Sequence, residues 1–161
     1  MTIEEEADFL MLCNDMELIP GVKEMLDEFE KNRIPMYVLS NSGFTAKALW
    51  TVLDRFVIGQ YFSNVWSSAD YGKIKPCKEF FEQAINTALS EHHEESKEDI
   101  LFIGDTYSTD VIGAHDAGIK AVWINRKKEE DVLKYATYQI AETRDLLDVV
   151  RENQSEGRFS D

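Results

Sequence analysis

The sequence predicts an α/β fold in which a doubly wound parallel sheet carries helices on both faces. Short apolar runs typical of buried parallel strands occur at 34–40, 64–68, 100–103 and 120–124. The segments between them carry apolar residues at helical spacing, and this alternation of strands and helices favours a parallel sheet. With 161 residues, 43% of them hydrophobic, the chain is long enough to fill the core of one domain.

The elements follow in order along the chain. In residues 1–17 a helix is predicted, with one apolar face made of Phe9, Leu12, Cys13 and Met16. A helix after Gly21 precedes the strand that ends at Ser40, and helices at 44–55 and after Lys75-Pro76 flank the strand at 64–68. A weak strand at 138–140 and a helix through Val150 complete a core domain at 18–150, and residues 151–161 are predicted to be a loose tail. The apolar helix positions of the core are Val22, Met25, Leu26, Phe29, Ala48, Leu49, Val52, Leu53, Phe80, Phe81, Ala84, Ile85, Ala88, Leu89, Leu146, Leu147 and Val150.

Charge and composition restrict the partners. The chain has 31 acidic and 17 basic residues, and the net charge of -14 makes nucleic acid and anionic membranes poor partners. No apolar run approaches the length of about 20 residues that a membrane span needs. Cys13 and Cys77 lack metal-ligand spacing and are predicted to be reduced packing residues, which indicates a cytoplasmic protein.

Polar residues follow the predicted strands at the edge where parallel sheets bind ligands. Asp105 and Asp110 lie beyond the strand at 100–103, and two nearby carboxylates favour a bound cation such as Mg²⁺. Ser40 and Asn41 can hydrogen-bond phosphate oxygens, helped by the N–H groups of the following helix. Lys75 can neutralise charge on a transferred phosphoryl group. Together these residues predict a site for phosphate and a divalent metal.

Each piece also has an ordinary structural explanation. Asp110 can cap a helix that begins near Val111, Asp105 can be a turn residue, and 40–43 can form a turn with an N-cap. Lys75 taken alone is a surface lysine, and His115 and Asp116 are predicted to be exposed or packed side chains of one helix. The charged run "SEHHEESKED" is predicted to be solvated, so His92 and His93 receive no functional role. The joint order of the pieces favours the site.

Three segments resemble motifs of the haloacid dehalogenase (HAD) superfamily, which consists mostly of phosphatases. "YVLSNSG" resembles its second motif, with Ser40; "SSADYGKIKPCKEFF" resembles the third, with Lys75; "LFIGDTYSTDVIGAHDAGIKAVWINR" resembles the fourth, with Asp105 and Asp110. The resemblance implies a HAD-like, Rossmann-like core and a Mg²⁺-dependent phosphatase acting on a small phosphorylated metabolite. In this family an aspartate attacks phosphorus, a second acid protonates the leaving group, and Mg²⁺ bridges nucleophile, phosphate and the fourth-motif acid.

The sequence departs from the family pattern at the first motif. No Asp-x-Asp-x-Thr segment precedes Ser40, and "FLMLCNDMELIPGV" resembles the last helix of the family's cap domain, which selects substrate and would here be largely absent. An alternative interpretation makes "FLMLCN" the central strand, with Asp15 as nucleophile and Glu17 as the second acid. The resemblance places the family's first strand between those ending at Ser40 and Asp105, so its absence would leave two strand edges open and favour association into oligomers.

Three hypotheses follow from this departure. The chain is a truncated HAD phosphatase whose nucleophile lies elsewhere, a compact capless phosphatase using Asp15, or a non-catalytic binding or scaffold module that keeps the fold.

Overall fold

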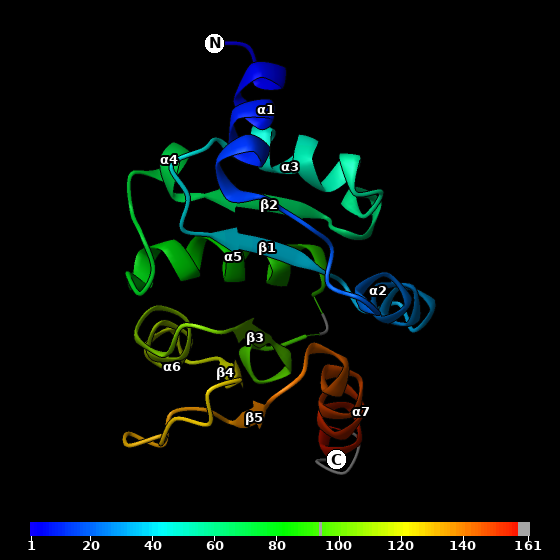
Figure 1. Ribbon diagram of the computed structural model, residues 1–161. Helices are drawn as coiled ribbons and strands as arrows, with labels where there is room; N and C mark the ends of the chain where they lie inside the picture. The colour runs from blue at the N-terminus through cyan, green and yellow to red at the C-terminus, as the bar shows by residue number, and fades with distance from the viewer. Residues whose placement is uncertain (94, 158–161) are drawn as a thin grey trace. The chain divides into compact units, whose positions relative to one another are not determined.

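The computed structural model describes residues 1–93 and 95–157 and divides the chain into two compact units. The N-terminal unit comprises Met1–Ile74 and the C-terminal unit Lys75–Asp161 (Figure 1). Both units contain parallel strands and helices, so the predicted α/β class is confirmed. Among the described residues, no helix is both long and apolar enough to span a membrane.

The N-terminal unit contains a small parallel sheet of two strands. Strand β1 pairs with β2 in a register that sets Ser40 opposite Ser67 at the carboxyl ends. The predicted strands at 34–40 and 64–68 are thereby confirmed, with shorter bounds. The elements of this unit are α1 (Ile3–Asn14), α2 (Val22–Lys31), β1 (Tyr37–Ser40), α3 (Ala46–Arg55), η1 (Gly59–Tyr61), β2 (Asn64–Ser67) and α4 (Ser68–Tyr71).

Helix α1 forms where a helix was predicted but buries a different face. Thr2 caps it in a capping box with Glu5, which satisfies N–H groups that the first turn would leave unpaired. Ala7 and Leu10 are buried, whereas Phe9 is 53% and Leu12 82% exposed. The predicted apolar face is therefore wrong, because the partner of α1 is α3, and Ala7 and Leu10 face its buried Ala48 and Val52. Cys13 is likewise exposed rather than a packing residue.

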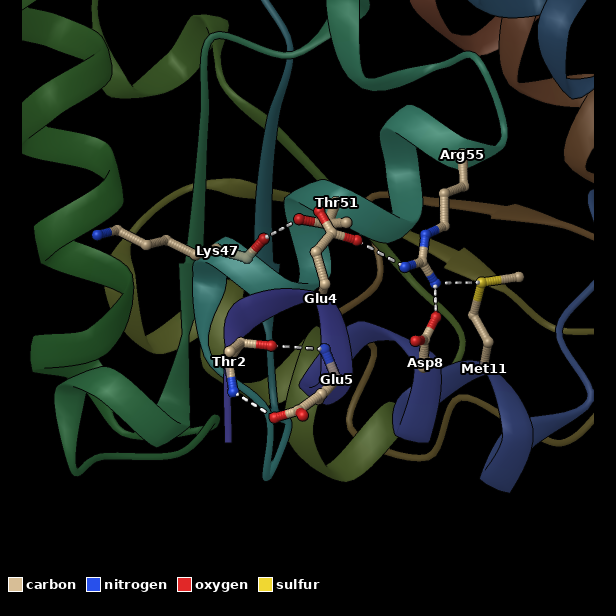
Figure 2. A network of polar contacts seen from close by, with 8 residues as sticks. All are labelled: Thr2, Glu4, Glu5, Asp8, Met11, Lys47, Thr51 and Arg55. Atoms are coloured by element: carbon tan, nitrogen blue, oxygen red, sulfur yellow. Dashed lines mark hydrogen bonds and ion pairs between the residues drawn. The ribbon is translucent and has the colours of Figure 1, made fainter.

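Ion pairs and hydrogen bonds join α1 to α3 at both ends of α3. Arg55, in the last turn of α3, lies 2.8 Å from carboxylate oxygens of both Glu4 and Asp8, as Figure 2 shows. At the other end, the Glu6 carboxylate accepts hydrogen bonds from the backbone N–H and the hydroxyl of Thr45. An anion at the N-terminus of α3 and a cation at its C-terminus both complement the helix dipole. These contacts fix α1 along α3.

The C-terminal unit contains a parallel sheet of three strands in the order β3-β4-β5. The predicted strands at 100–103, 120–124 and 138–140 are confirmed, with β3 shifted by one residue. The elements are α5 (Lys78–Glu91), η2 (Lys97–Asp99), β3 (Leu101–Gly104), η3 (Tyr107–Val111), α6 (Ile112–Ala117), β4 (Lys120–Ile124), β5 (Tyr138–Ile140), η4 (Thr143–Asp145) and α7 (Leu146–Gly157).

Strand β4 is the central and most buried strand of this sheet. Its residues Ala121, Val122 and Trp123 are at most 3% exposed, whereas Ile103 of β3 is 37% exposed. Helix α5 contributes Phe80, Phe81 and Ile85 to the core, as its periodicity predicts. Among the described residues, β3 is thus less completely buried than β4.

Helix α7 extends further than the sequence analysis predicted. It runs to Gly157, so residues 151–157 are helical rather than part of a loose tail, and residues 158–161 lie outside the described chain. Lys120 Nζ donates a hydrogen bond to Asn153 Oδ1, which ties this last part of the helix to the start of β4. A single contact between side chains leaves no periodic pattern in the sequence, so the longer helix was not predicted.

Candidate active site

A buried ion pair joins Lys75 to Asp110 in the C-terminal unit. Lys75 Nζ lies 2.7 Å from Asp110 Oδ1, and the two side chains are only 12% and 8% exposed. The same ammonium group lies 5.2 Å from the ring centre of Phe102 on β3. Two opposite charges removed from water interact strongly only when they are paired this closely. The structure thus brings together two residues that the sequence separates by 35 positions.

Asp110 lies inside η3, a single π-helical turn, and does not cap a helix. Its second oxygen, Oδ2, accepts a hydrogen bond from the Thr106 N–H, so both carboxylate oxygens have partners. A Cβ atom at Gly104 would lie 2.4 Å from the Asp110 side chain. Glycine is therefore required directly before Asp105, because any side chain would displace Asp110.

Of the two acids Asp105 and Asp110, Asp105 has the exposed carboxylate. It follows the last residue of β3, its side chain is 64% exposed, and its Oδ2 lies 4.0 Å from Arg126 Nη1. Thr106 Oγ1 donates to its other oxygen at 3.2 Å. The sequence analysis did not select Arg126, although its position two residues after β4 places it at the same edge of the sheet.

Ser40 and Asn41 lie in the N-terminal unit, where β1 ends. Ser40 is half-buried and Asn41 is exposed. The turn that follows is rigidified by serines that the sequence analysis passed over: Ser42 N–H donates to Ser68 Oγ at 2.9 Å, and Ser68 Oγ–H donates to the Ser42 carbonyl. The buried Ser67 hydroxyl donates to the Phe44 carbonyl.

Two N–H groups at the start of the following helix, which were expected to help bind phosphate, already have partners in this structure. Helix α3 begins at Ala46, and Ala46 N–H donates to the Asp70 carboxylate at 2.6 Å. The neighbouring Thr45 N–H donates to Glu6, also at 2.6 Å. These two N–H groups thus bind the protein's own carboxylates, and phosphate binding at this turn stays a prediction.

The alternative interpretation of residues 9–14 as a central strand is also wrong. These residues belong to α1, and Asp15 is its exposed C-cap in the left-handed conformation, with φ 43°. The hydrogen bonds of a helix exclude a place in a sheet. The family's nucleophile follows a strand, whereas Asp15 follows a helix.

Asp105 and Asp110 differ in how well they could hold Mg²⁺. Among residues 1–93 and 95–157, no three potential ligand side chains of His, Cys, Asp or Glu come together. Asp105 offers an exposed carboxylate of the kind Mg²⁺ binds while keeping several waters, so a single-carboxylate site fits. Asp110 fits less well, because Lys75 and Thr106 already hold both of its oxygens.

Residues 4–124 match the family model described as haloacid dehalogenase-like hydrolase. The chain belongs to this family. HAD-like hydrolases that resemble it include the pyrimidine 5'-nucleotidase PynA of Streptococcus pneumoniae, which is 28% identical over 93% of this chain and 64% of its own length. The glyceraldehyde 3-phosphate phosphatase of Pyrococcus furiosus is 27% identical over 86% of this chain and 57% of its own length. The chain thus spans less than two thirds of the length of either relative.

Solved structures of HAD proteins share the fold. A HAD phosphatase from Thermococcus onnurineus superimposes with a TM-score of 0.68 and 24% identity over 83% of this chain and 58% of that one. YfnB of Bacillus subtilis, bound to magnesium, superimposes with a TM-score of 0.68 and 24% identity over 84% of this chain and 56% of that one. These neighbours agree with the predicted HAD-like architecture.

Proposed function

We propose that this HAD-like hydrolase contributes the lysine, the fourth-motif acids and the second-motif serine to a Mg²⁺-dependent phosphomonoester phosphatase. The observation that carries the proposal is the buried pair of Lys75 with Asp110, which lies five residues after the exposed carboxylate of Asp105. A surface lysine would not lose its hydration in this way unless a partner compensated it. The kinship with phosphatases and nucleotidases supports the same reaction class.

Asp105 and Asp110 have different roles in this proposal. Asp105 is the carboxylate that would hold Mg²⁺, and the ion, when bound, neutralises charge on the phosphate oxygens. Asp110 orients the Lys75 ammonium, whose charge stabilises the phosphoryl group during transfer. Ser40, at the end of β1, and the exposed Asn41 donate hydrogen bonds to phosphate, as the resemblance of "YVLSNSG" implies. Each role rests on the contacts that its own unit provides.

The nucleophile is proposed to lie outside these 161 residues. Its family position follows a strand, whereas Asp15 ends a helix. Within the described residues β1 pairs only with β2, and β3 only with β4, so each has one edge free of a described strand. These edges, and the exposure of Ile103, are what a strand supplied by another segment would cover.

The proposed substrate is a small phosphorylated metabolite in the cytoplasm. The named relatives act on a nucleotide and on a triose phosphate, and both substrates are small phosphate esters. The net charge of -14 disfavours nucleic acid polymers and anionic membrane surfaces. The identity of the ester depends on the part of the family fold that selects substrate.

Binding and turnover measured on the same protein test the proposal. Calorimetry should show that the protein binds Mg²⁺ and inorganic phosphate. Asp105→Asn should weaken the binding of Mg²⁺, and Lys75→Met should weaken the binding of phosphate. The 161-residue chain should hydrolyse an aryl phosphate no faster than its Asp105→Asn variant does. Arg151→Met, in the exposed part of α7, is the matched control and should change the affinity for neither ligand. A folded chain that binds neither ligand would overturn the metal and phosphate roles. Mg²⁺-dependent turnover by this chain alone would overturn the external nucleophile.

A further inference from the structure

The backbone of Asp105 is held from β4 rather than by its own loop. The indole Nε1–H of Trp123, a residue only 3% exposed, donates to the main-chain oxygen of Asp105 at 3.2 Å. The carboxylate of Asp105 is mostly exposed and makes only a long contact with Arg126 and one hydrogen bond with Thr106. Its orientation is therefore decided mainly through the carbonyl that Trp123 fixes.

Tyr107 provides a second anchor two residues further on. Its ring packs edge-on against Trp123, with ring centres 4.7 Å apart and an interplanar angle of 67°. Its hydroxyl donates a hydrogen bond to Asp131, in the segment between β4 and β5. Tyr107 also begins η3, the π-helical turn that carries Asp110. Single π-helical turns are rare and often occur at functional sites.

Asp131 is itself held in place by the chain around it. Its carboxylate accepts hydrogen bonds from the N–H groups of Tyr135 at 3.3 Å and Ala136 at 3.1 Å. Burial raises the pKa of Asp131, but the hydrogen bonds from Tyr107, Ala136 and Tyr135 outweigh burial and leave the pKa below its usual value. The carboxylate is therefore ionised at neutral pH and is a strong acceptor for the Tyr107 hydroxyl.

We propose that Trp123, Tyr107 and Asp131 are positioning residues, which hold the segment from Asp105 to Asp110 in the orientation that the metal and phosphate site requires. The inference rests on the function proposed above for Asp105. Trp123 fixes the start of the segment and Tyr107 its middle, while Asp131 joins Tyr107 to the loop before β5. None of the three needs to touch substrate, because each acts through the backbone of the acidic segment.

Tyr107→Phe is the sharpest test, because it keeps the ring on Trp123 and removes only the hydroxyl. The chain offers a matched control in Tyr61→Phe, which removes the hydroxyl of another tyrosine bonded to an aspartate, Asp27, in the other unit. Tyr107→Phe should weaken Mg²⁺ binding about tenfold by calorimetry, as loss of a ligand-supporting contact does. Tyr61→Phe should leave Mg²⁺ affinity unchanged.

A second measurement does not depend on the metal. In metal-free protein, amide hydrogen exchange at Thr106 and Asp110 should accelerate in Tyr107→Phe and not in Tyr61→Phe, because these N–H groups lie within the anchored segment. The indole resonance of Trp123 should shift in the same variant only. Should Tyr107→Phe fail to fold, both measurements can be made on Asp131→Asn, for which we expect the same weaker Mg²⁺ binding and faster exchange.

The outcomes separate the two proposals. Unchanged exchange and unchanged Mg²⁺ affinity in folded Tyr107→Phe would overturn the positioning role. Acceleration spread over the whole unit, without a local maximum at Thr106 and Asp110, would also overturn it, since that indicates a general loss of stability. If the unsubstituted protein binds no Mg²⁺, the function proposed for Asp105 fails, and hydrogen exchange alone decides whether Tyr107 holds the segment.

Discussion

At the scale of single residues, burial distinguishes the two acids of the candidate site. The Asp110 side chain is 8% exposed and paired with Lys75, whereas the Asp105 side chain is 64% exposed and contacts Arg126 at 4.0 Å and the Thr106 hydroxyl at 3.2 Å. Breaking a buried ion pair leaves a charge without compensation, while an exposed pair is screened by water. The two carboxylates, five residues apart, should therefore respond differently to the same substitution.

Asp110→Asn should destabilise the protein by about 3 kcal/mol, because it leaves the Lys75 ammonium buried beside a neutral amide. Asp105→Asn should change the free energy of unfolding by less than about 0.5 kcal/mol. Urea unfolding of both variants checks the difference. Equal effects of the two substitutions would mean that Lys75 does not depend on Asp110 for its burial.

At the scale of elements, the docking of α1 on α3 depends on Arg55. This side chain is 30% exposed and contacts Glu4, Asp8 and, through Nη1, the sulfur of Met11 (Figure 2). Arg55→Met should destabilise the protein, and by less at high salt, where the ion pairs of Arg55 in the unsubstituted protein are already screened. Lys47→Met on the same helix is the control, because the Lys47 side chain is exposed. Chemical unfolding at two salt concentrations makes the comparison.

The contact between α2 and η1 predicts a late tyrosine titration. The hydrogen bond to Asp27, followed by burial, raises the pKa of Tyr61 from 10.0 to about 12. Because the folded pKa is the higher one, this contribution to stability is complete below about pH 10 and is lost as the pH rises through 12. In a titration of the six tyrosines by ultraviolet difference absorbance, the last ionisation should belong to Tyr61. This last step should be missing from the titration of Tyr61→Phe. Ionisation of all six tyrosines near pH 10 would contradict this prediction.

At the scale of the whole molecule, open strand edges and charge act in opposite directions. β1 and β3 each have an edge without a described partner, and Leu12 and Phe9 expose an apolar part of α1. The net charge of -14 opposes contact between copies of the chain. Self-association should therefore increase with salt, because the screening length falls from about 10 Å at 0.1 M to about 3 Å at 1 M.

Sedimentation velocity at low and high salt measures this association. Leu12→Lys should reduce it if the exposed face of α1 takes part, whereas association that persists in this variant would point to the strand edges. A single-chain mass at every salt concentration would contradict the prediction.

The order and type of the elements followed from local signals in the sequence. Apolar runs such as 120–124 form strands, and the spacing of Met25, Leu26 and Phe29 produces a helix that buries them. The motif residues could be selected in the same way, since Lys75 precedes a proline, Asp105 follows the last glycine of a strand, and Asp110 lies five residues further on. Their joint pattern also allowed the family to be predicted, and the family match confirms it.

The tertiary structure alone decided which partners these elements and residues meet. The buried face of α1, with Ala7 and Leu10, depends on its packing against α3, some 40 residues away in the sequence. Contacts between distant segments include the pairing of Lys75 with Asp110, the bond from Trp123 to the Asp105 carbonyl, and the bonds from Thr45 to Glu6. Local periodicity reports which side of an element is apolar, whereas such contacts depend on how the chain packs in three dimensions.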